Sequence, residues 1–384
     1  MTTRTAVTTR TAVTTRTAVT TRTHEPRITD ISVLSVAGLG LETVRERLGA
    51  AASEDLPLNE PPRADAADYV GIPGSVSAVP SFDITDFVPK KGTKNIDRTT
   101  ALGLAASARL KRTLTESAGI TDDSWLSTGV AMGSMVGSLR SSIELDSRVI
   151  EGAGIDLINP AQFPNTTMNC CAAQVAIWHR FRGPNSTLAN GSLSAVSALQ
   201  YASRLIDRGH GQRMLVGGVE ELSPHTAWGI RSKKIVHDTV PVAEAAAVFA
   251  LEPDGLSDAP ALATVAACAV GFAPVRTDAG YAEALRRVTA GVLRRAGVDD
   301  TAVGLVLPGA EGTVLAEAEQ AALAGFAAPR VDVRAAFGEC GSALGALQVA
   351  AALAAGRPGD TALITGIDIS GAVGAAVLRI GAAA

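Results

Sequence analysis

The sequence predicts an α/β protein whose β-sheets are covered by helices on both faces. Strand patterns alternate with helix patterns twice over along the chain, which is typical of this class. The segment 243–251 is almost wholly apolar, as in a strand that is buried on both faces. With 384 residues, the chain is long enough for two halves that each bury a large core.

Composition limits which residues can build the core and which classes of function the chain can have. The chain is 47% hydrophobic but only 4% aromatic, so its core must be built from Ala, Val, Leu and Ile. A net charge of −4 provides no basic field for nucleic acid. The four cysteines have neither zinc-site spacing nor a disulfide pattern, which favours a reduced, cytoplasmic protein without a metal site. No membrane span and no signal peptide are expected.

The first 27 residues are expected to form a disordered tail. Residues 2–23 repeat the hexamer TTRTAV, whose charges are all positive and which offers little apolar surface to bury. An anion-binding arm and a misassigned start site are the alternatives.

The N-terminal half is expected to cover residues 28–255. It opens with an alternating strand and an amphipathic helix, followed by an irregular Pro- and Asp-rich excursion at 53–89. Asp97 is a plausible N-cap for a helix that ends at Gly119. The expected strands are 28–37, 128–132, 186–189, 213–216 and 243–251, and the expected helices are 41–50, 97–119, 169–178 and 193–207, with a helical excursion at 138–159.

A tight corner at Asn190 and Gly191 is the centre of this half. It places Ser192 at the N-terminus of the helix 193–207, where backbone N–H groups favour negative charge. Nucleophiles and oxyanion sites often occur at such corners. The strand that follows is expected to close with a turn at Gly217 and Gly218.

The C-terminal half is expected to cover residues 256–384, after a link at 253–260. Its predicted strands are 261–271, 303–307, 360–367 and 375–380. Its predicted helices are 281–296, which is expected to end at Gly297, 316–326 and 343–355.

Three anchors in the central block carry a family resemblance. Phe-Pro-Asn at 163–165, Gly-Pro-Asn at 183–185 and Gly-Gly-Val-Glu at 217–220 occur in the order and spacing of the β-ketoacyl synthases. This block therefore resembles those condensing enzymes, and the similarity extends over residues 28–384. It implies the thiolase fold, a duplicated five-layered α-β-α-β-α architecture.

The same resemblance implies that no catalytic residue is intact. The family's nucleophilic cysteine corresponds to Ser192, and its two histidines correspond to Gly309 and Glu339. Arg334 stands in place of a family lysine, and Glu317 matches a downstream acid. The family's final glycine loop is changed at 366–371, and none of the five histidines falls at a family position.

Several side chains have alternative interpretations. Ser192 could be a nucleophile with Glu339 as its base, but a carboxylate is a weak base toward serine, and a helix cap is the simpler role. Glu220 and Glu221 are adjacent on a strand, so they point to opposite faces and are not expected to share a proton. The candidates for a tunnel or interface are Phe163, Met168, Cys170 and Cys171.

A condensing-enzyme scaffold without its chemistry resembles the chain length factor of type II polyketide synthases. The resemblance implies a heterodimer with an active ketosynthase, a tunnel that sets chain length, possible assignment to reducing or polyene-forming systems, and an acyl carrier protein as partner. No cofactor is expected, since the acyl chains would arrive on the carrier's phosphopantetheine. The alternatives are an acyltransferase that uses Ser192 to form an ester or amide, and an inactive homodimer that only binds a carrier protein.

Overall fold

The computed structural model describes residues 25–51, 66–150 and 159–381. The expected tail therefore lies outside the described residues except for its last three. Those three belong to the fold, because the first strand already begins at Arg27 and Glu25 pairs with Arg379.

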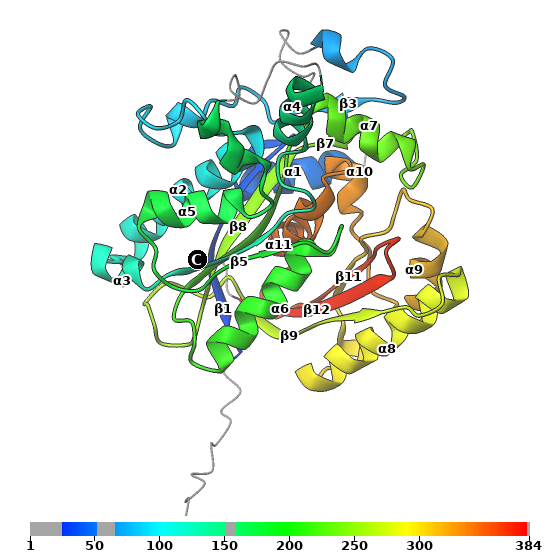
Figure 1. The fold of residues 1–384 in the computed structure, drawn as a ribbon. Helices are drawn as coiled ribbons and strands as arrows, with labels where there is room; N and C mark the ends of the chain where they lie inside the picture. The colour runs from blue at the N-terminus through cyan, green and yellow to red at the C-terminus, as the bar shows by residue number, and fades with distance from the viewer. Residues whose placement is uncertain (1–24, 52–65, 151–158, 382–384) are drawn as a thin grey trace, which may run out of the picture.

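One large sheet runs through both halves of the chain (Figure 1). Its order is β10-β11-β12-β9-β1-β8-β6-β4-β5, with β2 beside β1. The strands are β1 (Arg27–Ser35), β2 (Gly38–Leu39), β4 (Gly129–Gly133), β5 (Asn185–Leu188), β6 (Met214–Glu220), β8 (Ala245–Glu252), β9 (Ala263–Phe272), β10 (Leu305–Leu307), β11 (Thr361–Ile367) and β12 (Ala372–Ile380); β3 (Val76–Ser77) and β7 (Val242–Ala243) form a separate pair. The halves join where Arg27 and Ile28 of β1 pair with Thr264 and Ala263 of β9.

Helices form three layers around the two parts of this sheet. The helices are α1 (Leu41–Ala51), α2 (Arg98–Ala118), α3 (Asp122–Leu126), α4 (Leu139–Ile150), α5 (Cys170–His179), α6 (Ser194–Asp207), α7 (Pro224–Ser232), α8 (Asp278–Ala296), α9 (Ala316–Ala322), α10 (Val333–Phe337) and α11 (Leu344–Ala355). Short 3₁₀ turns are η1 (Ala66–Tyr69), η2 (Ile84–Asp86), η4 (Pro160–Thr166), η5 (Asp300–Ala302) and η6 (Gly341–Ala343).

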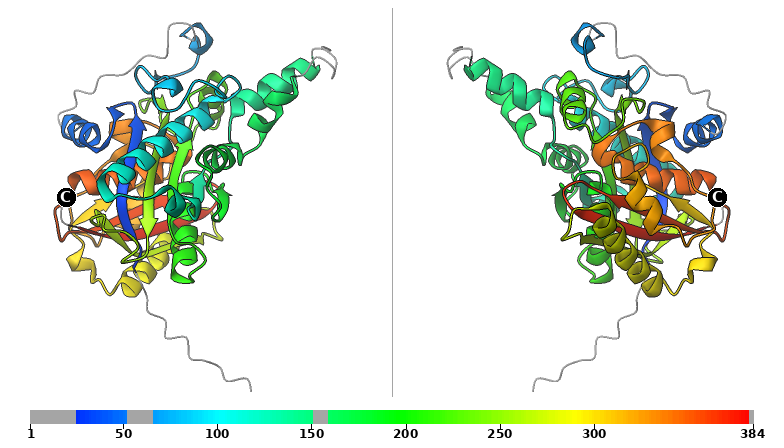
Figure 2. Two further views of the ribbon diagram at one scale, coloured as in Figure 1. Left: turned by 90° about the vertical axis from the view of Figure 1, so that its left-hand side faces the viewer. Right: turned by 90° about the vertical axis from the view of Figure 1, so that its right-hand side faces the viewer.

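The layers confirm the expected architecture. Helices α6 and α11 pack on each other and contact strands of both halves. Helices α2 and α5 cover the outer face of the N-terminal strands, and α8 and α9 lie outside the C-terminal strands (Figures 1 and 2). Helix α11 is buried along nearly its whole length, which suits its run of Ala and Leu.

Local signals explain where the long helices begin and end. The Asp97 side chain accepts the N–H of Thr100 at 2.9 Å and caps α2, as predicted. Gly119 ends this helix at φ 59°, and Gly297 ends α8 at φ 62°, a conformation that favours glycine.

The expected turn at Gly217 and Gly218 is wrong, because β6 continues through both glycines to Glu220. A Cβ on Gly217 would lie 2.1 Å from the Ala247 carbonyl oxygen of β8. A Cβ on Gly218 would lie 2.4 Å from the carbonyl oxygen of Ser342. These glycines therefore permit close packing within and above the sheet.

Other differences concern short elements. Helix α9 ends at Ala322, four residues before the predicted end, and α7 and α10 were not predicted. The described part of the 53–89 excursion contains η1, β3 and η2.

Candidate functional site

The corner before α6 is fixed by a serine other than the one expected. Gly191 has φ 55°, and the hydroxyl of Ser194 accepts the Asn190 N–H at 2.9 Å and donates to the Gly191 carbonyl oxygen at 2.6 Å. Ser192 precedes the helix and does not cap it, so the capping prediction is wrong. The N-cap residue is Leu193, without a side-chain cap bond, and the Ser194 hydroxyl instead bonds back across the turn.

Ser192 bonds instead to a carboxylate from the other half of the chain. Its N–H donates to Asp368 Oδ2 at 3.0 Å, and its hydroxyl donates to the same oxygen at 3.3 Å. Asp368 follows β11 directly, in the loop where the family's glycine pattern is changed. That substitution was the available sequence signal, but the sequence does not show that the carboxylate reaches Ser192.

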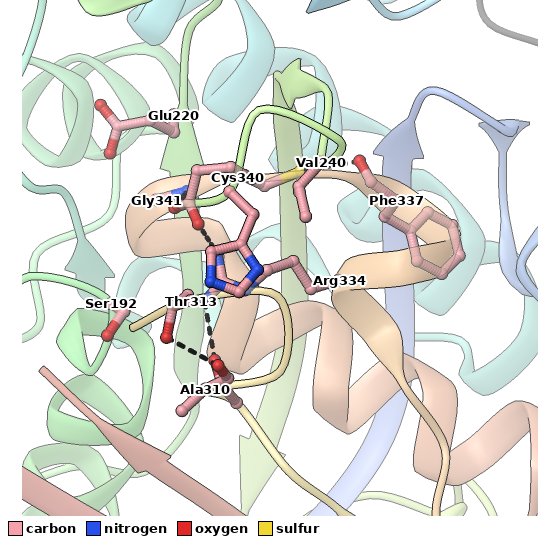
Figure 3. Close-up of polar contacts among 12 residues, drawn as sticks. Ser192, Glu220, Val240, Ala310, Thr313, Arg334, Phe337, Cys340 and Gly341 are labelled. Atoms are coloured by element: carbon pink, nitrogen blue, oxygen red, sulfur yellow. Dashed lines mark hydrogen bonds and ion pairs between the residues drawn. The ribbon is translucent and has the colours of Figure 1, made fainter. Parts of the chain in front are cut away.

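A cavity of about 630 Å³ lies beside this pair. Ser192, Asp368 and Glu339 all line it, so the structure brings two of the three expected catalytic positions together. The polar and charged side chains that share it with them are Asn190, Lys233, Arg276, Thr313, Arg334 and Ser370. Figure 3 shows Ser192, Thr313 and Arg334 approaching this region from separate segments.

Glu339 is neutralised by a buried arginine. Its carboxylate pairs with Arg334 and also accepts the Gly341 N–H at 2.8 Å. The Arg334 guanidinium donates to the carbonyl oxygen of Gly309 at 2.7 Å. Burial lowers the pKa of Arg334 to about 10, which still leaves it cationic near neutral pH. Arg334 therefore places a positive charge directly against the Glu339 carboxylate, at the position that the sequence comparison matched to a family histidine.

Gly309 brings no side chain to this arrangement. Its backbone N–H and that of Ala310 donate to the carboxylate of Glu319, and Thr365 adds its hydroxyl at 2.8 Å. Glu317, the acid matched from the sequence, is exposed on α9. The acid that holds the Gly309 loop is thus Glu319, because it lies on the inner face of α9.

Glu220 and Glu221 have separate partners, as predicted. Glu220 accepts the Ser342 N–H and hydroxyl, whereas Glu221 accepts the Ser138 hydroxyl and the Arg140 N–H. Burial raises the pKa of each carboxyl from 4.5 to about 7.

The four tunnel or interface candidates divide into two pairs. Phe163 and Met168 are 59% and 49% exposed. Cys170 and Cys171 are buried at the start of α5, where Cys171 packs against Gly103 of α2. The cavity beside Ser192 is lined by other residues of the described chain.

The described residues contain neither a metal-binding cluster nor a helix suited to a membrane. In residues 25–51, 66–150 and 159–381, no group of three or more His, Cys, Asp and Glu side chains is arranged to hold a metal ion. Over the same ranges, no helix combines the length and apolar character that a membrane crossing needs.

Comparisons with known proteins agree with this scaffold. The model of the β-ketoacyl synthase N-terminal domain matches residues 51–266. The 3-oxoacyl-[acyl-carrier-protein] synthase 2 of Vibrio harveyi is 30% identical over 146 residues, which are 38% of this chain and 34% of that protein. The same enzyme of Rhizobium meliloti is 28% identical over 197 residues, 50% of this chain and 46% of that protein. The matched parts thus span about a third to a half of these curated relatives.

Solved structures match over nearly the whole chain. The ishigamide ketosynthase/chain length factor has a TM-score of 0.81 and 30% identity, and the match covers 93% of this chain and 99% of that one. A β-ketoacyl synthase from Burkholderia phymatum STM815 has a TM-score of 0.78, 18% identity and coverages of 93% and 99%. A type II polyketide synthase ketosynthase, solved with its acyl carrier protein, has a TM-score of 0.75, 16% identity and coverages of 92% and 98%. The chain belongs to the β-ketoacyl synthase family.

Proposed function

We propose that this chain is a non-catalytic ketosynthase-like subunit, a chain length factor, of a type II polyketide synthase. It would pair with an active ketosynthase and shape the tunnel that receives the growing chain. The observation that carries the proposal is the set of groups at the three family positions. They are a serine hydroxyl bonded to a carboxylate, a glycine, and a glutamate paired with an arginine.

These groups cannot perform condensation by the family's route. A thiolate is nucleophilic near neutral pH and exchanges readily with thioesters, whereas a serine hydroxyl needs an adjacent strong base. Developing oxyanions need hydrogen-bond donors or positive charge, and each such group is worth about two or more powers of ten in rate. Glu339 would repel an oxyanion, and its partner Arg334 is already engaged.

For the acyltransferase alternative, the structure provides a candidate base, but the N–H that would stabilise the oxyanion is already bonded. Asp368 accepts the Ser192 hydroxyl at 3.3 Å, so it could in principle remove that proton. However, the same carboxylate oxygen accepts the Ser192 N–H, which is the group that would stabilise an acyl oxyanion. The non-catalytic assignment therefore fits the geometry better.

An exposed apolar face supports a partner subunit. Large apolar side chains are exposed on α4, η4, α5 and α7 and in the link between η4 and α5. Helix α4 contacts η4 and α7, and η4 contacts α5. The members of this apolar face are Val149, Ile150, Phe163, Met168, Ile177 and Trp228. Exposed apolar patches of this kind are typical of protein interfaces. A ketosynthase/chain length factor and a ketosynthase solved with its carrier protein are among the structural relatives, which favours the same two partners here.

The remaining parts of the proposal concern the pathway. The chain would need no cofactor of its own, since its partner would handle acyl groups on the carrier's phosphopantetheine. The low aromatic content favours a reducing, polyene-forming system, and the complex would act in the cytoplasm.

Co-expression with the ketosynthase from the same gene cluster tests this function. Native mass measurement should give a one-to-one complex whose activity survives Ser192→Ala. Phe163→Asp should dissociate the complex, while Leu39→Asp, at an exposed site outside the apolar face, should leave it intact. Met168→Trp should shorten the products. A stable homodimer that acquires an acyl group on Ser192 would instead establish the acyltransferase.

A further inference from the structure

Asp368 lies at the point in the cavity where an external anion would be expected. Backbone N–H groups ahead of a helix attract negative charge. Here the N–H of Ser192, two residues before α6, points at Asp368 Oδ2 at 3.0 Å. The hydroxyl of Ser192 approaches the same oxygen at 3.3 Å. One carboxylate oxygen thus accepts the N–H of the residue at the family's nucleophile position and is the nearer of two acceptors of its hydroxyl, the other being the Ile367 carbonyl oxygen at 3.5 Å.

The surroundings of this carboxylate fit it closely. A Cβ on Gly191 would lie 2.0 Å from Asp368 Oδ2, so the absence of a side chain at Gly191 leaves the space that the carboxylate fills. The other carboxylate oxygen accepts the Ser370 N–H at 2.9 Å. Gly191 therefore leaves room for the carboxylate, and the loop that carries Asp368 orients this carboxylate toward Ser192.

The loop that carries Asp368 is also held at its ends. The Asp368 N–H donates to the Ala372 carbonyl oxygen, and the Gly371 N–H donates to the Asp368 carbonyl oxygen, both at 2.9 Å. The Tyr281 hydroxyl of α8 donates to the Ile369 carbonyl oxygen at 3.0 Å. These bonds reduce the freedom of Asp368 to swing away from Ser192.

We infer that Asp368 is an internal anion that fills the oxyanion position beside Ser192 and keeps negatively charged groups out of that position. An arriving oxyanion or carboxylate would compete for an N–H that is already bonded and would meet a like charge within a few ångströms. This inference rests on the proposed function, because it explains why a chain that keeps a cavity of about 630 Å³ beside Ser192 does not catalyse a reaction there. Asp368 acts here as a positioning residue.

A thiol placed at position 192 reports directly on this negative charge. We would compare the alkylation rate by iodoacetamide, as a function of pH, in Ser192→Cys and in Ser192→Cys with Asp368→Asn or Asp368→Ala. Removing the neighbouring charge should lower the midpoint of the pH profile by about one pKa unit or more. Lys233, Arg276, Arg334 and Glu339 line the same cavity in every variant, so the difference isolates Asp368.

Two controls make the result decisive. Protein with the native serine corrects for the four natural cysteines, and Glu283→Gln in the Ser192→Cys background removes a carboxylate from the exposed face of α8. Asp368→Asn keeps the side-chain shape, so it tests the charge even if Asp368→Ala fails to fold. An unchanged midpoint in Asp368→Asn would overturn the inference. Complex formation with the ketosynthase is measured separately. A failure of the proposed function is therefore distinguishable from a failure of the inference about Asp368.

Discussion

Replacing Glu221 with glutamine should make the protein more stable at alkaline pH. Glu221 follows β6 and is 1% exposed. Its carboxylate accepts the Ser138 hydroxyl and the Arg140 N–H, each at 3.2 Å, at the start of α4. Burial, and secondly the charge of Asp97, raise its pKa from 4.5 to about 7.

The sign follows from proton linkage. Between pH 4.5 and about 7 the folded state binds the proton at Glu221 more tightly than the unfolded chain does, so stability falls as the pH rises through this window. Above the folded pKa the full penalty applies, and at about 1.4 kcal/mol per pKa unit it amounts to about 3 kcal/mol. In Glu221→Gln the amide oxygen can still accept the Arg140 N–H and the amide nitrogen can donate to the Ser138 hydroxyl.

The assay is the difference in melting temperature between Glu221→Gln and the native protein at pH 5 and pH 8.5. We expect a small gain at pH 5 and a clearly larger gain of several degrees at pH 8.5, where the full penalty of about 3 kcal/mol is removed. Glu283→Gln, which removes an exposed carboxylate, should show no such pH dependence. A loss of stability at pH 8.5, or an equal effect at both pH values, would refute the reasoning.

Three further predictions follow from packing and burial. Gly191→Ala should lower the melting temperature, because its φ of 55° and the 2.0 Å approach of Asp368 both exclude a Cβ; an unchanged melting temperature would contradict the geometry. Arg213→Met should cost about 3–5 kcal/mol by leaving Glu252 buried without its partner, and adding Glu252→Leu should recover part of the loss in denaturant unfolding; additive losses would argue against a shared ion pair. The four cysteines should react slowly with a thiol reagent until urea unfolds the chain, since burial raises the pKa of two of them to about 12; fast labelling of the native protein would contradict this burial.

The fold was predictable because its signals are local. The capping aspartate before α2 and the glycines that end α2 and α8 determine helix ends from nearby residues, and the structure confirms each one. The site was harder to predict from the sequence, because its central contact joins Ser192 to Asp368, which are 176 positions apart in the chain. Choosing between Glu317 and Glu319 required the orientation of α9, which a seven-residue helix does not specify by its pattern.

The glycines at 217 and 218 show why the resemblance bears more directly on the fold than on the function. They belong to the Gly-Gly-Val-Glu anchor that was matched to the family, and they were expected to form a turn. Each is instead required by an approach of under 2.5 Å between a hypothetical Cβ and a carbonyl oxygen. Such a requirement arises from packing alone and holds whether or not the neighbouring cavity supports a reaction. Ser192 and Glu339 are under no similar constraint, because the space that they face is open or is filled by charges from other segments. Gly309 differs from them, since a Cβ there would lie 2.8 Å from the Thr365 carbonyl oxygen. Anchors of the first kind therefore identify the scaffold, and only the groups that surround the cavity can decide what chemistry it supports.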